Sequence, residues 1–146
     1  MIRNLWRLQL PWRAVILGLF LLCGCNQPGA VPPADAARAA LEQALNAWKS
    51  GAPAGDIAGA TPPIQAVDHA WQTGRKLKSF EILREEPADD ERRFVVRREL
   101  EAAQEPEEVV YVVFGRDPIR VYAEEDYRRL IEMDNNPAPK RARGRR

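Results

Sequence analysis

The sequence predicts an α+β fold in which an N-terminal helix packs on a curved, cone-like sheet of four antiparallel strands. Apolar residues recur at helical spacing between residues 35 and 50 and then alternate with polar residues from residue 76 to 123. Clusters of Pro, Gly and acidic residues interrupt the alternation at regular intervals. A helix followed by consecutive antiparallel strands is typical of an α+β domain.

The helix is expected to begin after Asp35, a good N-cap, and to end at Gly51, which suits a left-handed C′ position. Its apolar face consists of Ala37, Leu41, Ala44, Leu45 and Trp48. The following residues 51–64 are rich in Gly, Ala and Pro and leave room for at most one turn. A second short helix is expected over residues 64–73.

Four strands are expected next, at residues 76–85, 92–102, 109–114 and 119–123. In the first strand Phe80 and Ile82 share one face, whereas Leu77 and Leu83 fall on the other. In the second, Arg98 falls among the apolar positions, so we expect its side chain to snorkel or to lie beyond the core edge. The third strand is apolar on both faces, which predicts a central strand covered on both sides.

A terminal helical segment is expected at residues 124–133, with Tyr127, Leu130 and Ile131 as its apolar side. Residues 135–146 are Pro-rich and basic and have no large apolar side chain, which predicts a disordered tail. About 100 residues precede this tail after the leader, so we expect one small domain over residues 35–134.

The first 24 residues have the layout of a secretory signal peptide, with three arginines before an apolar run from Ala14 to Leu22. Leu22-Cys23-Gly24-Cys25 resembles the lipobox of bacterial lipoproteins. The resemblance implies cleavage before Cys25, lipidation of its sulfur and acylation of its new amino group. Residues 25–34 then form the lipidated Cys25 and a Pro-rich tether. An ordinary cleaved signal peptide is the alternative.

The mature chain is acidic apart from its tail. Residues 25–135 contain 14 basic and 21 acidic residues, a formal charge of −7. Cys23 leaves with the signal peptide and Cys25 is consumed by lipid, so no disulfide is expected in the mature chain.

Three segments carry a family resemblance: Ala44 to Gly51, Val67-Asp68-His69-Ala70-Trp71, and Leu77 to Ile82. They are similar to the nuclear-transport-factor-2-like (SnoaL-like) superfamily of small cone-shaped domains, including uncharacterised lipoproteins of planctomycete-type bacteria. The resemblance covers roughly residues 34–126 and implies the fold rather than an activity. Because the chain is short for the family, a simpler cystatin-like sheet-on-helix domain is the alternative.

The candidate site residues favour a binding function over an enzymatic one. Adjacent residues point in different directions, so Asp68 and His69 cannot readily share a pocket. We expect Asp68 to cap a turn or pair with Arg75, and His69 to be exposed. Five aromatic residues could form the core or line a hydrophobic pocket: Trp48, Trp71, Phe80, Phe94 and Tyr111.

The basic tail is the one charge cluster expected to act as a unit, by contact with an anionic surface. Its cations are Lys140, Arg141, Arg143, Arg145 and Arg146. The acidic groups at strand ends are expected to be solvated turns. The sequence predicts no cofactor, no metal site, no catalytic residues and no nucleic-acid partner.

These features together predict a lipid-anchored envelope protein, facing the periplasm or in the outer membrane, that acts as a non-enzymatic binding or interaction module. Its partners would be the membrane, through the lipid anchor, and another envelope protein or a hydrophobic small molecule. The alternative is a small hydrophobic-ligand binder or a degenerate SnoaL-like enzyme with a pocket lined by Trp48 and Trp71. A buried carboxylate in a helix–sheet pocket would favour this alternative, whereas a filled core with an exposed strand edge would favour the interaction module.

Overall fold

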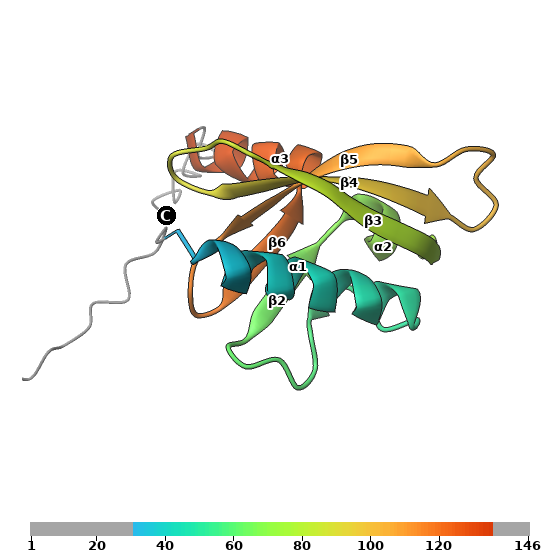
Figure 1. Ribbon diagram of the computed structural model, residues 1–146, viewed down its shortest axis with the longest axis horizontal. Helices are drawn as coiled ribbons and strands as arrows, with labels where there is room; N and C mark the ends of the chain where they lie inside the picture. The colour runs from blue at the N-terminus through green and yellow to red at the C-terminus, as the bar shows by residue number, and fades with distance from the viewer. Residues whose placement is uncertain (1–30, 136–146) are drawn as a thin grey trace, which may run out of the picture.

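Residues 31–135 are described by the computed structural model and form three helices and a six-stranded sheet (Figure 1). The helices are α1 (Ala34–Lys49), α2 (His69–Gln72) and α3 (Glu124–Asn135). The strands are β1 (Gly55–Asp56), β2 (Ile64–Val67), β3 (Leu77–Glu86), β4 (Arg92–Leu100), β5 (Glu107–Phe114) and β6 (Ile119–Ala123). The predicted signal peptide, Cys25 and the basic residues of the predicted tail lie outside the described residues.

The sheet order is β1-β2-β6-β5-β4-β3, with β2 parallel to β6 and the other neighbours antiparallel. The predicted α+β class is confirmed. The expectation of four antiparallel strands is wrong in detail, because β1 and β2 add a second hairpin to the edge of β6 and make the sheet mixed.

The short helix expected over residues 64–73 is wrong in its first part, because residues 64–67 form strand β2 and the helix α2 covers only residues 69–72. Ile64 and Ala66 are buried and alternate with half-buried Gln65 and Val67, as in a strand. Asp68 is still extended, and α2 begins only at the residue after it. The strand is stable because it pairs with residues 119–122, and the local sequence carries no sign of this distant partner.

Helix α1 lies across one face of the sheet, and its apolar stripe forms the centre of the core (Figure 1). Ala37, Leu41 and Leu45 are at most 1% exposed. The helix begins two residues earlier than expected, after Pro33, and Asp35 lies in its first turn rather than capping it. Its end agrees with the sequence, because Gly51 follows it with a φ of +88°.

Strand β3 contains two register shifts against β4, one between Leu77 and Ser79 and one between Ile82 and Arg84. Such bulges redirect the side chains that follow or precede them. This explains how Leu77 is buried in the same core as the half-buried Phe80 and Ile82, although simple alternation places it on the opposite face.

Helix α3 packs on the opposite face of the sheet, over β5 and β6 (Figure 1). Tyr127 contacts Phe114, with ring centroids 5.1 Å apart, and Val112 beneath the helix is fully buried. The prediction that β5 is covered on both sides is therefore confirmed. Helix α3 itself has no buried residue, and Arg93 on β4 joins it to the sheet by pairing with Glu124.

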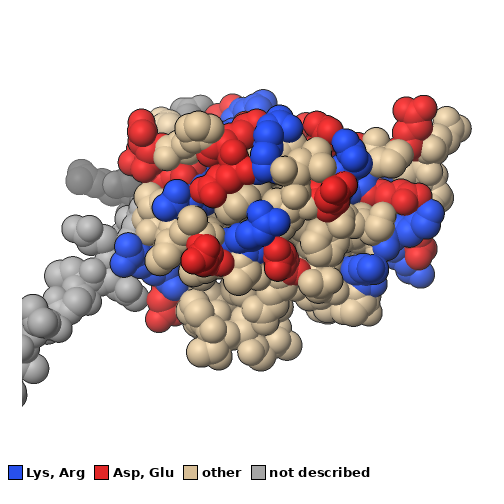
Figure 2. Space-filling model, viewed as in Figure 1, with Lys and Arg blue, Asp and Glu red and all other residues tan. Residues whose placement is uncertain are grey.

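Beyond α3, the outer face of the sheet is polar. Arg97 on β4 lies 3.5 Å from Glu81 on β3 and 3.5 Å from Glu108 on β5, at directly opposed register positions. In Figure 2, blue and red side chains are interspersed over most of the visible face. A tan region lies below them, over the segment between α1 and β2, where Asp56 is the one charged residue.

Candidate functional site

A buried polar network links β2, β4 and β5 at the end of the sheet beside the last turn of α1. Arg98 on β4 donates from Nη1 to Asp68 Oδ2 and, over 2.8 Å, to the hydroxyl of Tyr111 on β5. Tyr111 donates in turn to Asp68 Oδ2 over 2.7 Å. Arg98 is 7% exposed and Asp68 3% exposed. Arg98 therefore neither snorkels nor lies beyond the core, and Asp68 pairs with Arg98 rather than with Arg75.

Arg98 is held on three sides. Its Nε donates to Glu107 Oε1 over 2.8 Å, directly across the β4–β5 ladder, and its guanidinium carbon lies 5.3 Å from the ring centre of Trp48. Burial acts to lower the pKa of Arg98, but its electrostatic interactions with Tyr111 and Asp68 and its hydrogen bond to Glu107 outweigh burial and raise the pKa. The guanidinium stays charged, and the network is a fixed cation between two carboxylates.

Asp68 uses both carboxylate oxygens in structural bonds. As expected it caps a turn: Oδ1 accepts from the backbone N–H groups of Ala70 and Trp71, over 2.8 and 3.2 Å, at the start of α2. Oδ2 is occupied by Arg98 and Tyr111. A buried carboxylate with four donors has no free position from which to take a substrate proton. The ring of His69 is exposed, as the sequence predicts.

The two tryptophans form a stacked pair between α1 and α2. Their ring centroids lie 5.3 Å apart with planes inclined by 8°. Each indole N–H is satisfied by a backbone carbonyl at 2.8 Å, that of Arg75 for Trp48 and that of Ala52 for Trp71. One edge of the pair lines a small cleft of about 250 Å³, together with Gly51, Ala52, Pro53 and residues 74–76.

The other aromatic residues proposed for a pocket lie elsewhere. Phe94 and Tyr111 are at most 2% exposed and are part of the helix–sheet core. Phe80 is half-buried and packs against the same core from β3. The lining of the tryptophan cleft therefore contains Trp48 and Trp71 but none of these three residues.

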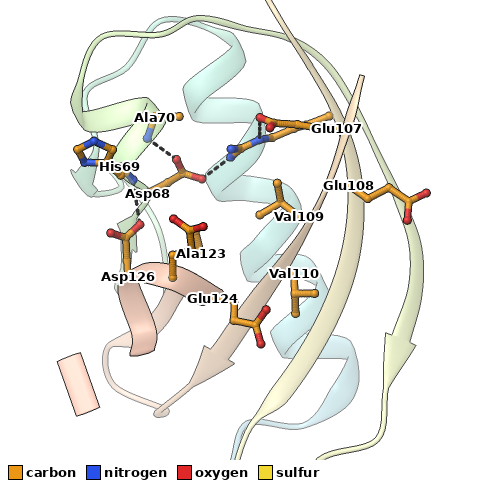
Figure 3. Close-up of a pocket in the computed structure, with 12 residues that line it drawn as sticks. Asp68, His69, Ala70, Glu107, Glu108, Val109, Val110, Ala123, Glu124 and Asp126 are labelled. Atoms are coloured by element: carbon orange, nitrogen blue, oxygen red, sulfur yellow. Dashed lines mark hydrogen bonds and ion pairs between the residues drawn. The ribbon is translucent and has the colours of Figure 1, made fainter. Parts of the chain in front are cut away.

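A larger cleft of about 370 Å³ opens beside the Asp68–Arg98 pair (Figure 3). One wall is the start of β5, residues 107–110, and the opposite wall is formed by the first residues of α2 and α3. Strand β6 pairs with β5 only from Tyr111 onward and ends at Ala123. Within residues 31–135, no strand pairs with residues 107–110 on this side, although β4 pairs with them on the other.

The cleft is strongly acidic. Its lining contains one buried cation, Arg98, and carboxylates from three elements: Asp68, Glu107, Glu108, Glu124, Glu125 and Asp126. Figure 3 shows Asp126 beside His69, whose backbone N–H donates to Asp126 Oδ2 over 2.9 Å. This bond joins the starts of α2 and α3 and fixes that wall of the cleft.

The sequence predicts solvated turns for the acidic residues at 107–108 and 124–126, and it carries no sign that the fold brings them together with Asp68. The one available signal was Arg98, a cation within the apolar alternation of β4, which implies a buried anionic partner. The partner lies thirty positions away in sequence, so the local pattern does not identify it.

Among residues 31–135, no group of three or more His, Cys, Asp or Glu side chains has the arrangement of a metal site. In the same range, no helix is long and apolar enough to cross a membrane. Comparison of the chain with known protein families, with curated proteins and with solved structures gives no match.

Proposed function

We propose that this chain is a lipid-anchored, non-enzymatic interaction module of the bacterial envelope. On this proposal the acidic cleft binds an extended, positively charged segment of a partner protein. The observation that carries the proposal is the unpaired edge of β5, residues 107–110, exposed in a cleft rimmed by carboxylates. A peptide strand added to a sheet edge gains main-chain hydrogen bonds, and its side chains gain specificity from the surrounding charges.

The filled core supports an interaction module over a ligand carrier. Val96, Val113, Tyr111 and Phe94, the inward side chains of β4 and β5, are at most 2% exposed beneath α1. The buried carboxylate of Asp68 is engaged by four donors and is not free to act as a base. The cone shape, the SnoaL-like family and the envelope location remain part of the proposal.

The experiment measures binding of a fluorescent peptide of alternating Val and Arg residues to the mature protein. A peptide of alternating Val and Glu is the control. We expect binding of the basic peptide alone, weakening as salt is added. Glu125→Lys, in the cleft, should reduce affinity about five- to tenfold, whereas Glu132→Lys, the same charge change farther along α3, should leave it nearly unchanged.

Hydrogen exchange distinguishes the addition of a peptide strand from nonspecific electrostatic attraction of the peptide. Bound peptide should protect backbone amides within residues 107–110, because these groups would donate to the added strand. Equal binding of both peptides, or equal loss in the two Lys variants, would count against the cleft as the site.

The second candidate function is binding of a small hydrophobic ligand at the tryptophan cleft. The stacked faces of Trp48 and Trp71 favour it, but the cleft volume of about 250 Å³ is below the range usual for ligand pockets, about 300–1,000 Å³. Titration with an anilinonaphthalene dye tests it, because occupancy beside the indoles would quench their fluorescence. Unchanged tryptophan emission would exclude this site.

A further inference from the structure

The two ends of the described chain meet at one end of the domain, opposite the acidic cleft. Arg92, at the start of β4, donates to the carbonyl of Pro32 over 3.2 Å, and Arg116 in the β5–β6 turn donates to the carbonyl of Val31 over 3.3 Å. The last turns of α3 lie at the same end, to the left in Figure 1. Ile131 there borders a depression that also contains Asp90 and Glu91 from the β3–β4 turn.

This end carries the exposed large apolar side chains of the described residues, Ile131 at 42% and Met133 at 66%. Both lie on the final turns of α3, which has no buried residue of its own. Within residues 31–135, Met133 is the more open of the two, and Ile131 is partly covered by the residues of the depression. The two side chains are two positions apart and project from different sides of the helix, so only a lipid surface that meets the end of the helix can contact both.

The length of the tether brings the same end close to a bilayer. Val31 is six positions after Cys25, and a fully extended chain over six steps spans at most about 21 Å. The acidic cleft lies farther away, because the six steps from Arg92 to Arg98 along β4 cover about 20 Å.

The charged residues at this end include carboxylates that repel an anionic lipid surface and cations that attract it. Asp89, Asp90 and Asp134 oppose a close approach to anionic lipid. Glu91, in the same depression as Asp90, and Asp117, in the β5–β6 turn, add to this repulsion. Residues 136–146, which follow α3, contain five basic side chains and no acidic one. Cations near an anionic membrane contribute about 1 kcal/mol each, so the five basic side chains offset this repulsion.

From these placements we infer that the end bearing Val31, Ile131 and Met133 rests on the lipid surface, with the acidic cleft turned away from it. The inference relies on the proposed acylation of Cys25. It assigns a lipid-facing surface to α3, and it leaves the unpaired edge of β5 open to partners from the aqueous side.

The test places an environment-sensitive dye on Met133→Cys or, as control, on Gln104→Cys in the β4–β5 turn. An acylated Cys25 has no free thiol, so the introduced cysteine is the one thiol of the mature chain. The mature protein is reconstituted in vesicles of phosphatidylcholine and phosphatidylglycerol. We expect severalfold stronger quenching by nitroxide-labelled lipid at position 133 than at 104, and the reverse order with aqueous iodide.

Two results would overturn the inference. Free access of iodide to position 133 means that this end points to water. Shielding of position 133 from both quenchers means that another copy of the chain covers it. Mass spectrometry of the same sample separates the causes: an unmodified Cys25 refutes the lipid anchor as well, whereas an acylated Cys25 with a water-exposed Met133 refutes the orientation alone.

Discussion

Arg98 and Asp68 form a buried ion pair that joins the C-terminal end of β4 to the N-cap of α2, with Tyr111 bonded to both. The pair fixes β2 and α2 against the far half of the sheet, because Asp68 also caps α2. It borders the acidic cleft and determines where the cleft wall lies.

Removal of the buried cation should be costly. Arg98→Met leaves Asp68 buried without its counter-charge, and we expect a loss of about 3–5 kcal/mol in the free energy of unfolding. Arg97→Met on the same strand is the matched control: its partners Glu81 and Glu108 are exposed, so it should lose about 0–1 kcal/mol. Urea unfolding of both variants measures the difference, and similar losses would contradict a structural role for the buried pair.

Truncation of the stacked indole should also destabilise the domain. Trp48→Ala removes a side chain that is 3% exposed, together with its contacts to Trp71 and Arg98, and should cost about 3–5 kcal/mol. Trp48→Phe keeps an aromatic ring but loses the bond to the Arg75 carbonyl, so about 1–2 kcal/mol is expected. A loss below about 1 kcal/mol for the alanine variant would be inconsistent with a buried Trp48.

The buried phenol predicts a loss of stability in alkali. Burial, and then the charge of Asp68, raise the pKa of Tyr111 well above 10, despite the opposing charge of Arg98. Tyr111 therefore keeps its proton in the folded state while an unfolded Tyr ionises near pH 10, so stability is full below pH 10 and declines as pH rises from there towards the raised pKa. Denaturation followed from pH 8 to 11 measures the decline. Tyr111→Phe should flatten it, and an unchanged slope would mean that other groups control it.

The lipid anchor makes a separate prediction. Cys25→Ser should abolish acyl labelling and block cleavage by the lipoprotein peptidase, whereas Cys23→Ser should do neither. Labelling with a clickable fatty acid in cells, followed by gel mobility, reports both steps. Equal labelling of the wild type and the Cys25 variant would exclude lipidation at this residue.

The basic segment is expected to act on binding rather than on stability. Deletion of residues 136–146 removes five cations and no large apolar side chain, so the melting temperature should stay nearly unchanged. Binding to anionic vesicles should weaken on deletion and with added salt, because both reduce charge attraction. If vesicle binding changes neither with salt nor with the deletion, the basic segment does not contribute to membrane binding.

The sequence predicts those elements whose signal is local. Strand β6 and the C-terminal end of α1 agree with the hydrophobic pattern, since alternation and a left-handed glycine are read within a few residues. Strand β2 and the Arg98–Asp68 pair depend on partners many positions away, and local periodicity carries no trace of them. The acidic cleft was missed for the same reason, because its carboxylates come from separate elements that only the folded chain brings together.

The parallel pairing of β2 with β6 has a consequence for the order of assembly. Ile64 on β2 pairs with Ile119 on β6. The hairpin of β1 and β2 therefore has no neighbouring strand to join in the sheet until β6 has been made. Contacts between distant positions close slowly, because the long loop must be ordered before they form. A chain that stops before residue 119 would lack half of the sheet and could not hold Asp68 against Arg98. Strands β3, β4 and β5 pair with their neighbours in sequence, whereas the half of the sheet that contains β1 and β2 can be completed only once β6 has been made.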